Sequence, residues 1–121
     1  MTKQFSFSKY ENELLPDFRQ KINMAESTED IKKFFIYTTT ELFNHVFEGK
    51  LDIKYEDIAL NPTEKPYYTV SKRLFSKENF LSVWNDSDLP RVMGRLAESS
   101  SNRYKHLEKN PAKTDSKIRT P

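Results

Sequence analysis

Residues 29–48, EDIKKFFIYTTTELFNHVFE, decide the fold of this 121-residue chain. Residues that can face a core recur three or four positions apart, the period of an α-helix. They are Ile31, Phe34, Phe35, Thr38, Leu42, His45 and Val46, with Ile36, Phe43 and Phe47 at neighbouring angles. An apolar surface this wide predicts a helix that packs against partners on more than one side and is therefore central. Gly49 supplies the left-handed conformation that ends it.

An earlier helix is predicted to begin at Ser8, because Ser8 and Glu11 have the spacing of a capping box. Its apolar stripe repeats every four residues, at Tyr10, Leu14, Phe18 and Ile22. Pro16 interrupts this stripe, which predicts either one kinked helix or a turn followed by a helix that starts at Pro16. A second start signal, residues 27–30 (STED), precedes the central helix.

The hydrophobic period changes after Gly49. Apolar and charged residues alternate over residues 51–57, and residues 67–70 (YYTV) are rich in strand formers. These segments predict a short β-hairpin between residues 51–57 and 67–73. The alternative is a helical turn from Tyr55 to Leu60 with irregular chain around it.

Helix is expected again from Ser76, with a break at residues 85–88 (NDSD). Pro90 then opens a last helix that ends near Asn110. We therefore expect a mainly α fold, a small single-domain bundle of about four helices, with the hairpin between the second and third. The domain spans residues 8–110, residues 1–7 form a flexible N-terminus, and residues 111–121 form a disordered basic tail.

Composition excludes several kinds of site. Two glycines cannot supply a Gly-rich phosphate loop, and a chain without cysteine has no disulfide and no thiolate zinc site. The longest uncharged, mostly apolar run, Phe34 to Thr40, is too short to span a bilayer, and the N-terminus lacks the apolar stretch of a signal peptide. We expect a cytoplasmic protein with no cofactor and no membrane contact.

Cations and aromatic rings alternate in residues 65–77, KPYYTVSKRLFSK, which contain no acid. Cations that follow phosphates, interleaved with rings that stack on bases, are typical of single-stranded nucleic acid binding. The candidate surface for a nucleic acid or another anion combines this segment with the basic last helix. Its residues are Lys65, Tyr67, Lys72, Arg73, Lys77, Arg91, Arg95 and Arg103. The alternative interpretation is an edge strand whose charges discourage aggregation.

Two smaller candidate sites remain. Glu41, His45 and Glu48 have the i, i+4 and i+7 spacing that would place a carboxylate–imidazole metal set on one helical face. The alternative is a solvated stripe on that helix. Phe80 and Trp84 would form a partner-binding patch if the fold left them exposed together, and core residues if it did not.

Three functions are compatible with these features. The first is a small non-enzymatic adaptor or regulatory protein that binds another protein, or its own copy, through an aromatic-rich surface. The second is a nucleic-acid binding module that uses residues 65–77 and the basic C-terminal helix. The third is a small enzyme with a carboxylate and histidine site, which the scarcity of catalytic residue types makes the least favoured.

Overall fold

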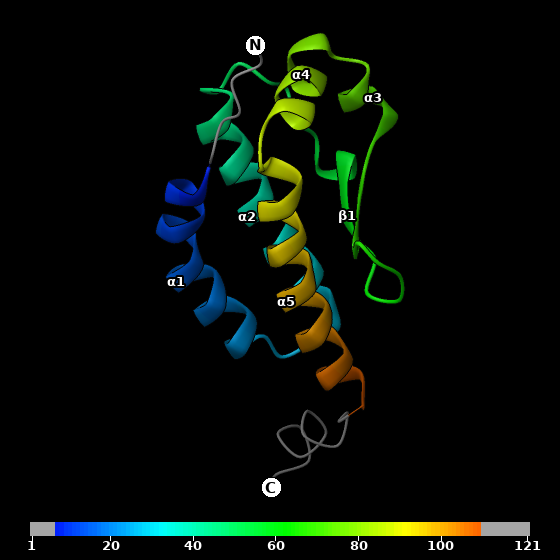
Figure 1. Cartoon of the computed structure of the whole chain (residues 1–121). Helices are drawn as coiled ribbons and strands as arrows, with labels where there is room; N and C mark the ends of the chain where they lie inside the picture. The colour runs from blue at the N-terminus through cyan, green and yellow to red at the C-terminus, as the bar shows by residue number, and fades with distance from the viewer. Residues whose placement is uncertain (1–6, 110–121) are drawn as a thin grey trace, which may run out of the picture.

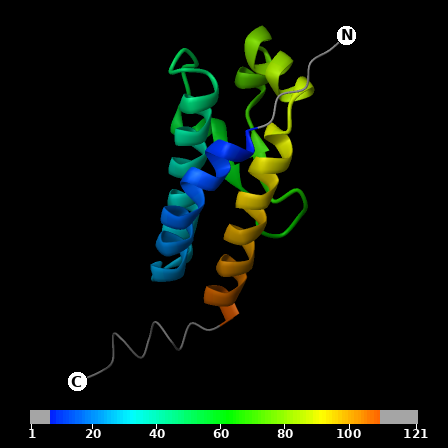
Figure 2. The ribbon, with the colours of Figure 1, turned by 60° about the vertical axis from the view of Figure 1, so that its left-hand side comes forward.

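Three long helices lie side by side in the computed structural model, which describes residues 7–109. They are α1 (Ser8–Met24), α2 (Thr28–Val46) and α5 (Leu89–Lys109). Figures 1 and 2 show that α1 and α5 both run antiparallel to α2. Two shorter helices, α3 (Lys72–Phe75) and α4 (Glu78–Asp86), cover one end of the bundle, and a two-stranded sheet lies along one side.

The described chain is a small, mainly α domain, as the sequence predicts, and it has five α-helices where about four are expected. The extra helix, α3, is a single turn that begins because the Ser71 hydroxyl accepts a hydrogen bond from the Leu74 N–H. Of the predicted termini, residues 1–6 and 111–121 lie outside the described residues. Phe7 belongs to the fold, since its N–H donates to Asp88 Oδ1 at 2.8 Å. No helix in the described range has the length and apolar character needed to cross a membrane.

Helix α2 is the centre of the core and contacts α1, α5 and the sheet. Its side chains Ile31, Phe35, Leu42 and Phe43 are completely buried. The Ser27 hydroxyl caps its N-terminus by accepting from the Asp30 N–H at 3.1 Å. At its C-terminus both Glu48 and Gly49 have positive φ, and the Gly49 N–H donates to the Asn44 carbonyl. The sequence prediction of a central helix is confirmed, although it ends at Val46 rather than at residue 48.

Helix α1 is one helix that passes through Pro16. Proline costs a backbone hydrogen bond, but burial of Phe18 and Ile22 on the same helix opposes that cost. The predicted capping box at Ser8 is wrong. Residue Phe7 is the N-cap, without a side-chain cap, and the Glu11 carboxylate binds Arg95 on α5 instead.

The predicted hairpin exists, but its first strand is not at residues 51–57. Strand β1 (Ile58–Leu60) pairs antiparallel with β2 (Tyr68–Val70), with Ala59 opposite Thr69. The residues before β1 form a 3₁₀ turn, η1 (Tyr55–Asp57). Buried Asp57 holds this turn by accepting from the Lys54 N–H at 2.8 Å, so the alternating pattern around it does not become a strand.

The last two helices also depart from the predicted boundaries. Helix α4 starts at Glu78 instead of Ser76, because Ser76 closes α3 with its N–H bound to the Lys72 carbonyl. Helix α5 runs unbroken through the serines at 99–101. Ser100 and Ser101 are completely buried there, so packing overrides their weak helix propensity.

Candidate functional site

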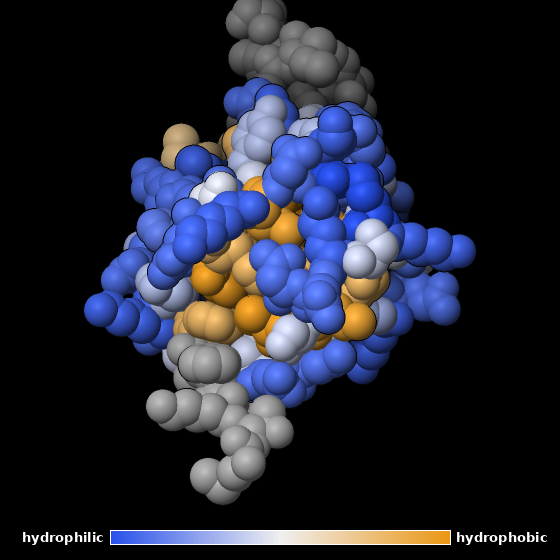
Figure 3. Space-filling model, turned by 90° about the horizontal axis from the view of Figure 1, so that it is seen from above, coloured by the Kyte–Doolittle hydropathy of each residue, from blue (hydrophilic) through white to orange (hydrophobic). Residues whose placement is uncertain are grey.

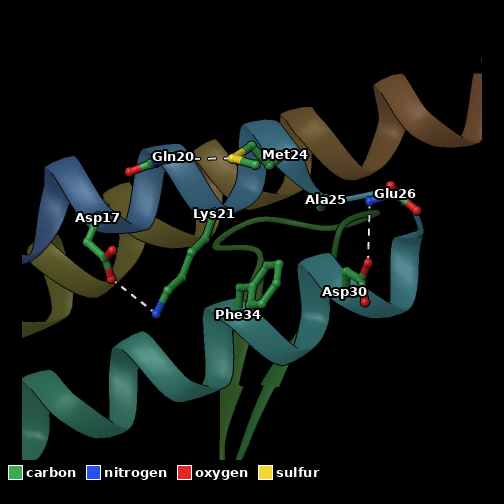
Figure 4. A pocket seen from close by; sticks show the side chains of 8 residues that line it. All are labelled: Asp17, Gln20, Lys21, Met24, Ala25, Glu26, Asp30 and Phe34. Atoms are coloured by element: carbon green, nitrogen blue, oxygen red, sulfur yellow. Dashed lines mark hydrogen bonds and ion pairs between the residues drawn. The ribbon is translucent and has the colours of Figure 1, made fainter.

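A hollow of about 430 Å³ lies between the C-terminal part of α1 and the N-terminal part of α2. We call it the α1–α2 groove. Figure 4 shows Phe34 projecting from α2 toward α1, with Asp17 and Lys21 extending from α1 over the same space. The groove is therefore made by two helices that meet in the turn at residues 25–27.

The apolar part of the groove contains Met24, Ala25 and Phe34. Met24 is 70% exposed, the largest exposure of any bulky apolar side chain in the described chain. Phe34 is half-buried and packs against the core, whereas Ala25 is buried. A flexible thioether beside a ring forms a surface that adapts to different apolar side chains.

Acidic side chains surround this apolar part. Asp17, Glu26 and Asp30 line the groove against one cation, Lys21, so the lining has an excess of negative charge. Lys21 Nζ lies 3.1 Å from Asp17 Oδ2, and both side chains are exposed, which makes this ion pair weak. The carboxylates around the groove therefore attract a cationic ligand.

Backbone contacts in the connecting turn fix the shape of the groove. The Glu26 N–H donates to Asp30 Oδ2 at 3.3 Å, and the Asp30 N–H donates to the Ser27 hydroxyl. On the other side of the turn, the Arg103 guanidinium donates to the carbonyls of Ile22 and Asn23, the last turn of α1. These contacts thus hold the turn to the start of α2, and hold the end of α1 to Arg103 of α5.

The predicted Phe80–Trp84 patch is not an exposed aromatic surface. Phe80 is completely buried at the centre of a ring cluster, and Trp84 is half-buried. Four rings have centroids 5.4–5.6 Å from that of Phe80: Phe43, Phe47, Phe75 and Trp84. These contacts fasten α3 and α4 to the end of α2, so Phe80 is unavailable to a partner.

An apolar area remains on the end of the bundle that carries α4. Figure 3 looks onto this end and shows apolar side chains framed by hydrophilic ones. Leu81 on α4 is 40% exposed, while Val83 and Phe75 are half-buried and pack on the core. This α4 face is a second apolar surface, at the end of the bundle away from the α1–α2 groove.

The predicted anion-binding residues divide into two groups. Lys65, Tyr67, Arg91 and Arg95 line one hollow of about 380 Å³ between the β1–β2 loop and α5, which we call the α5–loop cleft. The other four, which do not line it, are Lys72, Arg73, Lys77 and Arg103. Of these, Arg103 caps α1, as described above.

Arg73 is occupied by an internal contact. Its guanidinium binds the buried Asp57 carboxylate and donates to the Asp52 carbonyl at 2.7 Å. Asp57 Oδ1 also accepts from the Ser71 hydroxyl at 2.6 Å. The Arg73 hydrogen bonds hold the pKa of Asp57 far below its ordinary value near 3.8, outweighing the opposite effect of burial. This cluster joins η1 to the start of α3 and is part of the folded framework.

The predicted metal face is not formed. Because α2 ends at Val46, Glu48 lies outside the helix and does not follow Glu41 and His45 along one face. The His45 ring stacks on Tyr10 with centroids 5.4 Å apart. Within residues 7–109, no three histidine, cysteine or acidic side chains are grouped to hold a metal ion.

Sequence reasoning missed the α1–α2 groove. Phe34 belongs to the predicted apolar stripe of the central helix, and Met24 lies outside the repeating stripe of the preceding one. The sequence does contain one indication of the groove: Met24 is a bulky apolar residue at the end of a helix, with acidic residues before and after it at Asp17 and Glu26. Whether such residues share a hollow depends on how the two helices pack.

No protein-family model, curated protein or solved structure matches this chain. We therefore infer function from the shape and chemistry of the surfaces described above.

Proposed function

We propose that this protein is a small, non-enzymatic cytoplasmic adaptor whose α1–α2 groove binds a basic, partly apolar segment of another protein. The observation that carries the proposal is the combination of an exposed Met24 with an acidic lining in one hollow. This surface differs from the aromatic patch expected from the sequence, because the fold buries Phe80.

The apolar side chains supply the driving force for binding. A methionine that is 70% exposed gains free energy when a partner covers it. Phe34 beside it offers a ring, and rings and methionine are enriched where proteins bind each other. A leucine or similar side chain of the partner is expected to insert between them.

The carboxylates supply the preference for a basic partner. Asp17, Glu26 and Asp30 surround the apolar part, so lysine or arginine flanking the inserted side chain is favoured and an acidic segment is repelled. Contacts of this kind at the rim govern the rate of association and its dependence on salt.

Binding can be tested with a short peptide of alternating lysine and leucine, labelled for fluorescence anisotropy. We expect saturable binding that weakens as salt is raised. A peptide with glutamate in place of lysine is expected not to bind. Substitution of Met24→Ser should weaken binding roughly five- to tenfold, since about 1–1.4 kcal/mol of apolar burial is lost.

Matched variants locate the binding. Leu81→Ser removes an exposed apolar side chain from the α4 face and should leave the affinity unchanged. Asp17→Asn should reduce the salt dependence, whereas Glu41→Gln, an exposed carboxylate on α2 outside the groove, should not. If Met24→Ser and Leu81→Ser weaken binding equally, the groove is not the site and the proposal fails.

A further inference from the structure

The α5–loop cleft has a chemistry unlike that of the α1–α2 groove. Its walls are Lys65, Pro66 and Tyr67 of the β1–β2 loop, facing Arg91, Gly94 and Arg95 on α5. Figures 1 and 2 both place this loop beside α5. The hollow is of a size that holds a small organic molecule.

Two of its cations are available to a ligand. Lys65 and Arg91 are exposed, and neither side chain makes an ion pair or hydrogen bond with any residue in the range 7–109. Arg95 differs, because its guanidinium binds both oxygens of the Glu11 carboxylate, at 2.6 and 2.7 Å. Lys65 and Arg91 are therefore the groups that can bind an anion such as a phosphate.

Tyr67 places an aromatic ring on the wall of the cleft. Its carbonyl accepts from the Asn61 N–H at 2.7 Å, and its N–H donates to the Glu64 carbonyl at 2.9 Å, so its backbone is held on both sides. Lys105 Nζ lies 5.1 Å from the centroid of the ring. The backbone that carries the ring is therefore held at the wall of the cleft, where a ring can stack on a planar ligand.

The charges change along the helix. Arg91 and Glu98 both line the cleft and lie seven residues apart, which is about 10 Å along an α-helix. Lys105, which contacts Tyr67, lies a further seven residues on. Along the α5 wall of the cleft, the Arg91 cation therefore lies at one end. The Glu98 carboxylate lies at the other end, nearer to the Tyr67 ring. A nucleotide has the matching order: an anionic phosphate, then a planar base whose amino groups donate to carboxylates.

We propose that the α5–loop cleft binds one nucleotide unit, with Lys65 and Arg91 on the phosphate, Tyr67 stacked on the base and Glu98 accepting from a base amino group. The unit is either a free nucleoside monophosphate or one nucleotide of a single strand. This proposal is independent of the peptide bound by the α1–α2 groove, because the two sites share no residue.

The test uses the full chain and a fluorescein-labelled oligoadenylate, with anisotropy measured at about 50 mM salt. Arg91→Gln and Lys65→Gln should each weaken binding about fivefold, while Lys33→Gln, an exposed cation on α2, should have no effect. Tyr67→Ala should weaken it about tenfold and Tyr67→Phe should preserve it, because stacking needs only the ring. Circular dichroism checks that each variant is folded. If Tyr67→Ala unfolds the chain, Arg91→Gln still tests the site, because the Arg91 side chain is exposed.

Competition distinguishes the sources of the nucleotide. Displacement of the probe by adenosine monophosphate supports a free nucleotide, and displacement by unlabelled oligoadenylate alone supports a strand. Displacement by inorganic phosphate as effective as that by adenosine monophosphate contradicts the proposal, because the base then contributes nothing. Absence of binding, or equal weakening by Arg91→Gln and Lys33→Gln, also overturns it.

Discussion

Among single residues, Asp57 joins the η1 turn to the start of α3 through its buried carboxylate. Its carboxylate accepts hydrogen bonds from the Lys54 N–H, the Ser71 hydroxyl and the Arg73 guanidinium. The carboxylate is buried, so its charge is sheltered from solvent and depends on these donors. The alternating sequence around it does not reveal this role, because a buried aspartate and an exposed one look the same in a chain.

The lowered pKa of Asp57 predicts acid sensitivity. Because the carboxyl binds its proton more weakly in the folded chain than in the unfolded one, its stabilisation is complete above about pH 4 to 5 and is lost as the pH falls below that range. Urea unfolding followed at several pH values should show this decline. Asp57→Asn should cost about 2 kcal/mol at neutral pH and make the decline shallower.

Asp52→Asn is the control for this prediction. Asp52 lies 3.8 Å from Arg73 but is largely exposed, so its loss should change the free energy of unfolding little at any pH. An acid profile of Asp57→Asn that matches the unsubstituted chain would contradict the role assigned to Asp57.

Buried hydroxyls give a second prediction at this scale. The side-chain oxygens of Thr39, Ser100 and Ser101 are buried and have no hydrogen-bond partner within the described chain. Ser100→Ala removes an unsatisfied polar atom and should raise the free energy of unfolding by about 0.5–1 kcal/mol. Ser99→Ala is the control, because it makes the same change in helix propensity at a half-buried position. A smaller increase in the free energy of unfolding for Ser99→Ala than for Ser100→Ala would show the effect of the buried hydroxyl.

At the scale of elements, a contact far apart in sequence decides how α1 packs. The Glu11 carboxylate is buried and is held by the two hydrogen bonds from Arg95 on α5. The spacing of Ser8 and Glu11 predicts instead that Glu11 caps its own helix, which is a local interaction. The fold uses it for α5 instead, because the bidentate ion pair satisfies both carboxylate oxygens.

Glu11→Gln is therefore expected to weaken the attachment of α1 to α5. We expect a loss of about 1–2 kcal/mol, reduced from the value of a fully buried pair because Arg95 is half-exposed. The measurement is urea unfolding, and Glu13→Gln, an exposed carboxylate two residues further along α1, serves as the control. A double-mutant cycle with Arg95→Gln should give a coupling energy that accounts for most of the loss. Additive effects would contradict direct pairing.

For the whole molecule, hydrophobic periodicity predicts the helices and the central position of α2. Buried Phe35 and Leu42 repeat with the helical period, so the signal is local in the chain. The hairpin was misplaced because residues 51–57 alternate like a strand, yet Asp57 is held by the distant Ser71 and Arg73. Local patterns therefore predict the elements, and long-range polar contacts set their boundaries.

The surfaces could be predicted only in part. The chemistry of Lys65, Tyr67 and Arg91 predicts a shared site, and the fold brings them to one cleft. The same chemistry predicts Arg73 and Arg103 at that site, but both bind inside the molecule. Arg73 binds the buried Asp57 carboxylate, and Arg103 binds carbonyls at the end of α1. Composition identifies the cations of a chain but not their partners. The α1–α2 groove required the packing of two helices before Met24 and Phe34 became one surface.

The most direct test of the proposed adaptor function is to locate the lysine–leucine peptide by titration of the ¹⁵N-labelled protein, followed by ¹H–¹⁵N NMR. We predict saturable shifts concentrated at residues 17–34, around Met24 and Phe34, with little change on α4 or in the β1–β2 loop. Shifts centred on α4 around Leu81, or no shifts at saturating peptide, would contradict the assignment of the α1–α2 groove as the binding site.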